Sequence, residues 1–396
     1  MDDRAARDDL SFMREALHVA GRIPRRPWPN PPVGALVVLD GRIVGRGAHH
    51  GAGAAHAEMV ALDQAGPRAR GATLYCTLEP CNHQGRTPPC APRVASSGIG
   101  RLVVAVIDPN PHVAGRGLDV VRDAGIEVTV GVAAEEALEL VWPFVITAAF
   151  ERPFVVLKTA TSLDGRFAPT SRRAEGGPAY LTGPEARHDV HRLRRWSDVV
   201  LVGKRTKEVD EPQLNGRLTT DCDACPAAEP LPAYVDTDLT LTAGWPGRAH
   251  WVFAGVSSAP VDRQQDVERQ HGTVVLCDER DGHVAPEALV DAFARRGGHC
   301  LLIEGGPTLA AACLQAGIVD RCISYVAPQV LGDGVSWPSW IMPGDGAHAA
   351  TLFTLTRVMR SGPDAKLVFD RADFAQALAR VSGGVGTVFQ QSITTP

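Results

Sequence analysis

The sequence predicts an α/β protein with two domains. The chain has 396 residues, which is more than a single hydrophobic core usually serves. Short runs rich in Val, Ile and Leu alternate with helix-like segments in both halves, as in sheets layered with helices. This alternation is interrupted near residues 145–153. We therefore expect domains over residues 1–148 and 149–372, followed by a C-terminal tail over residues 373–396.

In the first half, periodicity and turn residues give the order of the elements. Residues 10–20 have the spacing of an amphipathic helix, and Asp40-Gly41 is a tight turn between two short strands. Pro89 favours the start of a later helix. The expected helices are 10–20, 56–64 and 89–97, and the expected strands are 35–39, 42–45, 73–77, 102–107 and 126–130.

The second half repeats the α/β pattern. A Gly-Gly pair follows a buried strand and precedes a helix, an arrangement that lets a backbone approach a phosphate at the helix N-terminus. The expected strands are 154–158, 198–202 and 300–304, the expected helices are 184–196 and 307–316, and surface loops are expected at 217–230 and 255–272.

Composition excludes several classes of protein. The net charge of −5 argues against a general nucleic-acid binder. The sequence contains no apolar run long enough to span a membrane, and Met1-Asp2-Asp3-Arg4 does not begin a secretory leader. Nine cysteines, an odd number, do not suit a disulfide scaffold. We therefore expect a cytoplasmic protein that binds neither nucleic acid nor membrane.

A His-x-Glu motif and two cysteines carry the clearest chemical signal. His56 and Glu58 precede Cys81 and Cys90 in the order used by zinc deaminases. One His and two Cys provide three ligands, so a tetrahedral zinc keeps one position for water. Glu58 would carry the proton while water replaces an amino group on a ring carbon. The sequence thus predicts a deaminase of a nucleobase-like ring, with His56 and Glu58 at one helix start and both cysteines near another.

The spacing of the cysteines narrows the family. Nucleoside and nucleic-acid deaminases typically have Cys-x-x-Cys, whereas eight residues separate Cys81 from Cys90 here. With the runs 29–34 (Pro-Asn-Pro-Pro-Val-Gly) and 108–117 (Asp-Pro-Asn-Pro-His-Val-Ala-Gly-Arg-Gly), the first half resembles the cytidine-deaminase-like domain of the bifunctional riboflavin-biosynthesis deaminase/reductase family.

This resemblance implies roles for individual residues of the first domain. His56, Cys81 and Cys90 would bind Zn²⁺, and Glu58 would be the proton donor. Asn30 and His49 would contact the pyrimidine, and Arg86 would hold the ribose phosphate, because a phosphorylated substrate needs a cationic partner. We interpret His83 as structural, since a fourth protein ligand would close the metal site.

The second half resembles the reductase domain of the same family, which has a dihydrofolate-reductase-like fold. The matching runs are 158–166, 203–206, 210–212 and 304–309, and the similarity extends from about residue 155 to 370. The resemblance implies that the phosphorylated aminopyrimidine is held by Lys158, Arg187, Leu214, Arg217 and Glu304. It also implies that NADPH is contacted by Thr161, Tyr180, Thr206, Asp210, Thr237, Gly306, Pro307 and Thr308.

The sequence departs from the family pattern in one loop of the reductase half. The usual Gly-Glu-Ser-x-Trp-Ile is replaced by residues 176–181, after an insertion at about 172–175. Pro178 stands where the family has a serine, and it has neither a hydroxyl nor a backbone N–H. A second departure is Asp210-Glu211-Pro212 in place of Asp-Asp-Pro. The Cys222-x-x-Cys225 pair is a weak candidate for a metal or redox site.

The sequence therefore predicts a bifunctional enzyme of riboflavin biosynthesis. It would deaminate 2,5-diamino-6-ribosylamino-4(3H)-pyrimidinone 5′-phosphate and then reduce the ribosyl group with NADPH. One alternative is a paralogue with an active deaminase and a weak or redirected reductase in a specialised pteridine- or flavin-like pathway. The acidic charge opposes a nucleic-acid deaminase, and the intact zinc motif opposes a non-catalytic regulator. A homo-oligomer, dimer or tetramer, follows from the resemblance alone, and a preference for NADPH over NADH stays open.

Overall fold

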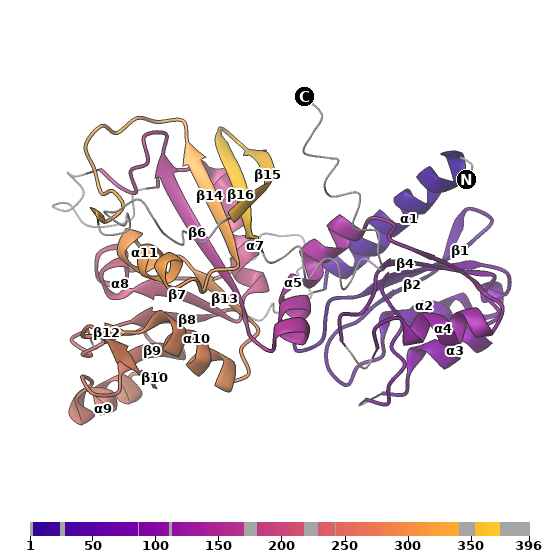
Figure 1. Cartoon of the computed structure of the whole chain (residues 1–396), viewed down its shortest axis with the longest axis horizontal. Helices are drawn as coiled ribbons and strands as arrows, with labels where there is room; N and C mark the ends of the chain where they lie inside the picture. The colour runs from indigo at the N-terminus through magenta and orange to yellow at the C-terminus, as the bar shows by residue number, and fades with distance from the viewer. Residues whose placement is uncertain are drawn as a thin grey trace. The chain divides into compact units, whose positions relative to one another are not determined.

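The chain forms two compact units, and each is α/β as expected (Figure 1). Described residues up to Glu151 belong to the first unit, and those from Arg152 onward belong to the second. The computed structural model describes residues 3–23, 28–85, 87–110, 113–169, 180–217, 229–241, 243–339 and 353–372. Among these residues, no helix is both long and apolar enough to cross a membrane.

A five-stranded sheet in the order β2-β1-β3-β4-β5 is the framework of the first unit. Strand β1 runs antiparallel to β2 and β3, whereas β3, β4 and β5 are parallel. The turn between β1 and β2 has φ of 50° at Asp40 and 73° at Gly41, which confirms the predicted tight turn. The strands are β1 (Gly34–Leu39), β2 (Arg42–Ala48), β3 (Thr73–Leu78), β4 (Arg101–Val106) and β5 (Glu127–Val130).

Helices cover both faces of this sheet (Figure 1). Helix α1 packs on β1 and β3 and also contacts α5, which packs on β4. On the opposite face, α2 lies against β1 and β2, and α3 lies between α2 and α4. The helices are α1 (Asp3–Gly21), α2 (Ala57–Ala65), α3 (Cys90–Ser96), α4 (Arg116–Asp123) and α5 (Ala134–Phe150), with a 3₁₀ turn at Gly66–Ala69.

Helix α1 is fixed to the sheet by a buried polar group. The Tyr75 hydroxyl donates to a carboxylate oxygen of Asp9 at 2.8 Å, and the Arg101 guanidinium donates to both oxygens at 2.9 and 2.8 Å. Because each acceptor is satisfied, the cost of burying Asp9 is offset.

Glycines in β2 allow α2 to lie unusually close to the sheet. A Cβ at Gly47 would lie 2.7 Å from the Ala61 nitrogen and even closer to the Ala57 carbonyl oxygen. Gly45 faces the backbone of Ala61 in the same way. Neither position has room for a side chain. The close contact fixes the position of the start of α2 relative to β2.

The second unit is built on a nine-stranded sheet in the order β10-β9-β8-β7-β13-β6-β14-β16-β15. The strands from β10 to β14 are parallel, and β16 and β15 extend the sheet as an antiparallel hairpin. The strands are β6 (Phe154–Ser162), β7 (Val199–Gly203), β8 (Leu231–Val235), β9 (His250–Gly255), β10 (Gly272–Cys277), β13 (Cys300–Ile303), β14 (Arg321–Ala327), β15 (Phe353–Ser361) and β16 (Asp364–Arg371), and Glu279–Arg280 (β11) and His283–Val284 (β12) form a small hairpin.

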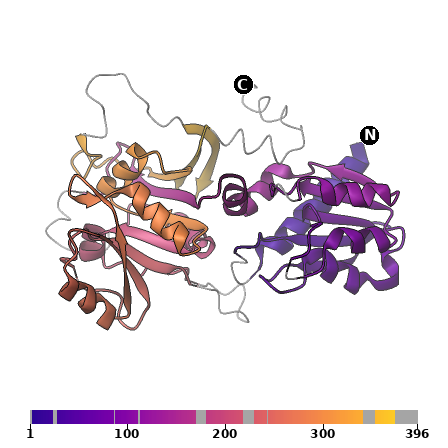
Figure 2. The same cartoon turned by 60° about the horizontal axis from the view of Figure 1, so that its bottom comes forward.

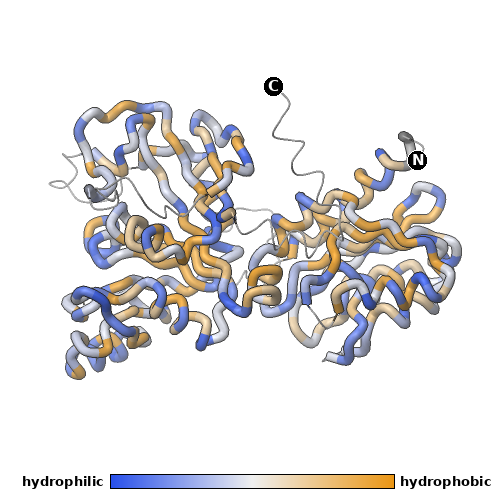
Figure 3. The backbone as a smooth tube through the Cα atoms, in the orientation of Figure 1, coloured by the Kyte–Doolittle hydropathy of each residue, from blue (hydrophilic) through white to orange (hydrophobic). Residues whose placement is uncertain are grey.

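The core of this unit lies along the parallel strands, which Figure 2 shows in a turned view and whose apolar residues stand out in Figure 3. Leu157, Leu201, Phe253 and Leu301 are fully buried there. The helices are α7 (Pro184–Trp196), α8 (Lys204–Asp210), α9 (Val261–Arg269), α10 (Pro286–Arg295) and α11 (Pro307–Gln315).

The surface loop predicted at 255–272 is wrong over most of its length. Helix α9 occupies Val261–Arg269, and β10 begins at Gly272. Val267 is the one residue of α9 that is buried. With a single apolar contact, this helix carries no 3.6-residue apolar stripe that periodicity could detect.

Candidate functional site

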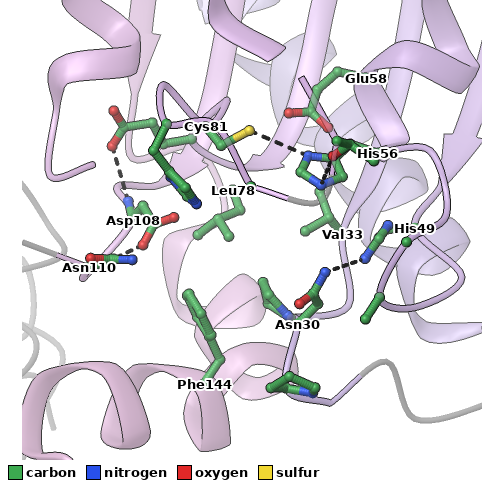
Figure 4. A pocket seen from close by; sticks show the side chains of 18 residues that line it. Asn30, Val33, His49, His56, Glu58, Leu78, Cys81, Asp108, Asn110 and Phe144 are labelled. Carbon is green, nitrogen blue, oxygen red and sulfur yellow. Dashed lines mark hydrogen bonds between the residues drawn. The ribbon is translucent and has the colours of Figure 1, made fainter. Parts of the chain in front are cut away.

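A cavity of about 350 Å³ opens in the first unit beside the start of α2 (Figure 4). Its wall combines the segment after the Trp28–Pro29 peptide, the loops that follow β2, β3 and β4, and Phe144 from α5. These loops bring the predicted zinc ligands, Glu58, Asn30 and His49 to one cavity.

His56, Cys81 and Cys90 form the metal-type cluster in the described part of the chain. The His56 Nδ1 atom lies 3.1 Å from the Cys90 Sγ and 3.5 Å from the Cys81 Sγ. Ligands of a tetrahedral zinc with usual bond lengths are roughly 3.5 to 3.8 Å apart, so this donor set fits the ion after a small adjustment. His83 is exposed and is not part of the cluster.

The local fold explains how these ligands meet. His56 is the N-cap of α2, and Cys90 is the first residue of α3. Cys81 follows β3, and its carbonyl accepts a hydrogen bond from the Ala91 nitrogen at 3.0 Å. The Thr87 hydroxyl lies 3.2 Å from the His56 Nε2, so it fixes the ring while Nδ1 faces the sulfurs.

Cys81 and Cys90 are joined by a hydrogen bond between their side chains. The hydrogen bond with Cys90 lowers the pKa of Cys81 to about 4, and the same bond raises the pKa of Cys90. His56 adds to the effect on Cys81 through its own hydrogen bond. The site is therefore prepared to present thiolate to a soft cation.

Glu58 lies in the first turn of α2 and its side chain is buried in the cavity wall. Burial raises the pKa of its carboxyl group to about 7. A carboxyl group with this pKa can both take up and release a proton near neutral pH, as a proton carrier must.

Asn30 and His49 are joined by a hydrogen bond at the cavity wall (Figure 4). The His49 Nδ1 lies 3.2 Å from the Ala55 carbonyl oxygen, which can only accept, so Nδ1 carries the proton. The Nε2 atom then accepts from the Asn30 amide nitrogen at 2.9 Å. Burial lowers the pKa of His49, in agreement with a neutral ring.

Asp108 and Asn110 also line the cavity, and the sequence analysis did not assign them a role. The Asp108 carboxylate accepts a hydrogen bond from the Asn110 nitrogen at 2.8 Å. Burial raises the pKa of Asp108 to about 7. The signal that could have identified them is the Asp-Pro-Asn run directly after a strand that follows the cysteine motif.

In the second unit, Glu304 forms the centre of a buried ionic group. Arg194 donates to both of its carboxylate oxygens, at 2.6 and 2.9 Å. Burial works to raise the pKa of Glu304, but the charge and hydrogen bonds of Arg194 outweigh it, so the pKa is lowered. Burial lowers the pKa of Lys158, whose charge also acts on Glu304. Lys158 and Glu304, both predicted from the sequence, are thus brought together.

Arg194, which the sequence analysis did not select, links Glu304 to the loop after α8. Its guanidinium donates to the Asn215 carbonyl at 3.3 Å. Asn215 lies between Leu214 and Arg217, whose φ values are 48° and 27°. Arg194 therefore connects two segments that both carry predicted substrate residues.

Arg187 lies on α7 like Arg194, but its side chain contacts different partners. It donates to the Thr182 carbonyl at 2.8 Å and stacks 4.8 Å from the ring centre of Tyr180. Tyr180 itself is 61% exposed. The described contacts do not join Arg187 to the group around Glu304.

The predicted cofactor residues collect at the carboxyl ends of the parallel strands. Helices α8 and α11 follow the neighbouring strands β7 and β13, and each begins at a glycine N-cap without a side-chain cap. A Cβ at Gly306 would lie 3.5 Å from the Thr206 hydroxyl oxygen, so the two helix starts adjoin. Uncapped N–H groups suit the phosphates of a dinucleotide. The remaining predicted residues lie on β6 (Thr161), at the end of α8 (Asp210), after β8 (Thr237) and in the first turn of α11 (Pro307, Thr308).

Five predictions fall wholly or mostly outside the described residues. They concern Arg86, the loop with Pro178, the surface loop at 217–230, the pair Cys222 and Cys225, and the tail over residues 373–396.

Fold and site together define a zinc-deaminase unit followed by a reductase unit that binds a dinucleotide. Residues 6–106 match the family model for the cytidine and deoxycytidylate deaminase zinc-binding region, and residues 153–367 match the RibD C-terminal domain.

Relatives and solved structures are similar to this protein over nearly the whole chain. Riboflavin biosynthesis protein RibD of Aquifex aeolicus is 39% identical over 83% of this chain and 89% of its own length, and that of Escherichia coli is 36% identical over 90% and 97%. The structure of Acinetobacter baumannii RibD has a TM-score of 0.75 at 34% identity, covering 93% of this chain and 99% of its own. A Thermotoga maritima structure, named as a diaminohydroxyphosphoribosylaminopyrimidine deaminase/5-amino-6-(5-phosphoribosylamino)uracil reductase, has a TM-score of 0.76 at 30% identity, covering 93% and 100%.

The chain belongs to the RibD family of bifunctional deaminase/reductases of riboflavin biosynthesis. The predicted fold class, the two enzymatic units and the cofactors Zn²⁺ and NADPH are thereby confirmed.

Proposed function

We propose that the first unit hydrolytically deaminates 2,5-diamino-6-ribosylamino-4(3H)-pyrimidinone 5′-phosphate and that the second reduces the ribosyl group of the product to ribityl with NADPH. The observation that carries the proposal is the cluster of His56, Cys81 and Cys90 beside buried Glu58 in a cavity of about 350 Å³. A cavity of this size accommodates one small polar ligand.

In the deaminase step, His56, Cys81 and Cys90 hold Zn²⁺. The ion, when bound, supplies the Lewis acidity that activates water for attack on the amine-bearing ring carbon. Glu58 takes up a proton and delivers it toward the ring nitrogen and the departing amine. Burial raises the pKa of Glu58, which favours the uptake of a proton by its carboxylate.

The rest of the cavity orients the pyrimidine. Leu78 and Phe144 provide apolar surface for the ring, and Asn30 and Asp108 face it with polar groups (Figure 4). His49 supports Asn30 through their shared hydrogen bond. Arg86 holding the ribose phosphate stays a prediction.

In the reductase step, Lys158 and Glu304 bind polar groups of the substrate, and Leu214 and Arg217 complete its site. We assign Arg194, rather than Arg187, to this group, because Arg194 contacts both Glu304 and the loop that follows Leu214. Arg187 instead supports Tyr180.

The carboxyl ends of the parallel strands would hold NADPH. The uncapped N–H groups at the starts of α8 and α11 would bind its phosphates. Side chains that contact the cofactor in this proposal are Thr161, Tyr180, Thr206, Asp210, Thr237 and Thr308, with the backbone of Gly306 and Pro307.

We also propose a cytoplasmic location and a homo-oligomeric assembly. A cytoplasmic setting keeps Cys81 and Cys90 reduced for the metal. We propose a homo-oligomer, a dimer or tetramer, which light scattering of the purified protein measures directly.

The decisive experiment follows ammonia release and NADPH oxidation by the zinc-loaded chain. The substrate is generated in place from GTP by a cyclohydrolase. We expect both signals in the wild type, and we expect Glu58→Ala to lose ammonia release by at least about 100-fold. Asp63→Ala is the matched control, because Asp63 lies on the same helix and is 67% exposed. Ammonia release without NADPH oxidation would refute the reductase assignment. The absence of both signals would refute the proposed substrate.

A further inference from the structure

Glu79, the residue after β3 and two before Cys81, has a buried carboxylate with an unusual set of partners. Its Oε2 accepts hydrogen bonds from the backbone nitrogens of Asp108 at 3.1 Å and Gly115 at 2.9 Å. Its Oε1 accepts from Gly117 at 2.9 Å and Leu118 at 3.4 Å. The side chain is 3% exposed, so these four N–H groups replace its water.

All four donors come from one segment, the loop between β4 and α4 and the first turn of α4. This segment carries Asp108 and Asn110, which form the cavity wall opposite His56 (Figure 4). The dashed line to the Asp108 nitrogen in Figure 4 is one of the four bonds. A single side chain therefore spans from the zinc-ligand loop to the opposite wall.

The two loops also touch through their backbones at the same place. A Cβ at Gly117 would overlap the Pro80 carbonyl oxygen and lie 3.1 Å from the Glu79 Oε1. Gly117 is thus required for the close approach, and Glu79 holds it. This joint consists of Glu79 and Pro80 on one side and of residues 108–110 and 113–118 on the other.

We propose that Glu79 is a positioning residue of the deaminase, which holds the Asp108–Asn110 wall at a fixed distance from the zinc ligands. The inference rests on the proposed deaminase function, and it adds a residue whose carboxylate oxygens are held by four backbone N–H groups of the loop that carries Asp108 and Asn110. Both carboxylate oxygens act as acceptors, so the residue is specifically a carboxylate and not an amide.

Glu79→Gln is the sharpest test because it keeps size and shape. Its NH₂ group must face two backbone N–H donors, whichever way the amide is turned, and at least two donors lose their acceptor. We expect KM for deamination to rise about 10- to 100-fold with zinc still bound at wild-type stoichiometry. Asp119→Asn is the matched control, since it removes one exposed carboxylate from α4.

Two further readouts separate positioning from a general loss of structure. NADPH oxidation by the second unit, supplied with the deaminated intermediate, reports that the full chain is folded. Backbone hydrogen exchange over residues 108–118 reports the joint itself and needs no substrate. If the wild type releases no ammonia while Glu79→Gln still accelerates this exchange, the proposed function fails and the joint stands.

Several outcomes would overturn the inference. Wild-type KM together with wild-type exchange in Glu79→Gln would show that the carboxylate holds nothing. Activity lost in proportion to zinc would mean that Glu79 serves the metal loop instead. Should Glu79→Gln not fold, Gly117→Ala strains the same joint from the other side, and the same measurements apply to it.

Discussion

Replacing Gly47 by alanine tests whether the seating of α2 on the sheet sets the geometry of the zinc site. The new Cβ would lie 2.7 Å from the Ala61 nitrogen, whereas ordinary contact begins at 3.4 Å. Helix α2 must therefore retreat by about 0.7 Å at that atom, and by more at the Ala57 carbonyl oxygen. Overpacking of this kind costs about 1–3 kcal/mol of unfolding free energy.

The displacement of α2 should also lower the deaminase activity. His56 and Glu58 stand at the start of α2, and a displacement near 1 Å in a reacting group costs about 100-fold in rate. We expect kcat/KM for ammonia release to fall by that order in Gly47→Ala, while NADPH oxidation on the deaminated intermediate is unchanged. Gly21→Ala is the control, because the nearest atom to its Cβ is 3.9 Å away. Wild-type kcat/KM in a folded Gly47→Ala protein would refute the reasoning.

Three further predictions concern charge and metal. In the metal-free protein, burial raises the pKa of Glu58 from 4.5 to about 7, so the free energy of unfolding falls as the pH rises through that range. Glu58→Gln removes this titration, so it should be more stable than the wild type by about 3 kcal/mol at pH 8 but not at pH 5. Thermal unfolding at the two pH values measures the difference. Arg194→Lys loses the bidentate contact with Glu304, so KM of the reductase should rise about tenfold or more, whereas Arg187→Lys should change it little; equal effects would contradict the assignment. Chelation of zinc should abolish ammonia release and leave NADPH oxidation intact when the deaminated intermediate is supplied, and loss of both would show that the metal maintains the whole chain.

The elements and the zinc site could be predicted because their signals are local. Buried strands appear as apolar runs, and Asp40-Gly41 has the residues that its turn requires. The ligands of a metal must be of a few residue types, so His56, Cys81 and Cys90 are visible without knowledge of the fold. Helix α9 was missed because only Val267 is buried, which leaves no apolar period to detect.

The partners of buried charges could not be predicted, since they depend on tertiary structure. Arg187 and Arg194 both lie on the arginine-rich α7, and only the packed structure reveals which one reaches Glu304, 110 residues away. Glu79 gave no sequence signal either, because its four partners are backbone groups that every residue type offers.

The hydrogen-bond chain from Ala55 through His49 to Asn30 has a consequence for inhibitor design. Its direction is fixed at the Ala55 carbonyl, so one of the two N–H groups of the Asn30 amide is committed to His49, and its second N–H and its carbonyl oxygen are left for the ligand. A ring nitrogen that bears hydrogen satisfies this oxygen, whereas an N-methyl group at the same place leaves the oxygen without a donor. Analogues that keep the N–H there should bind, and N-methylated analogues should bind more weakly.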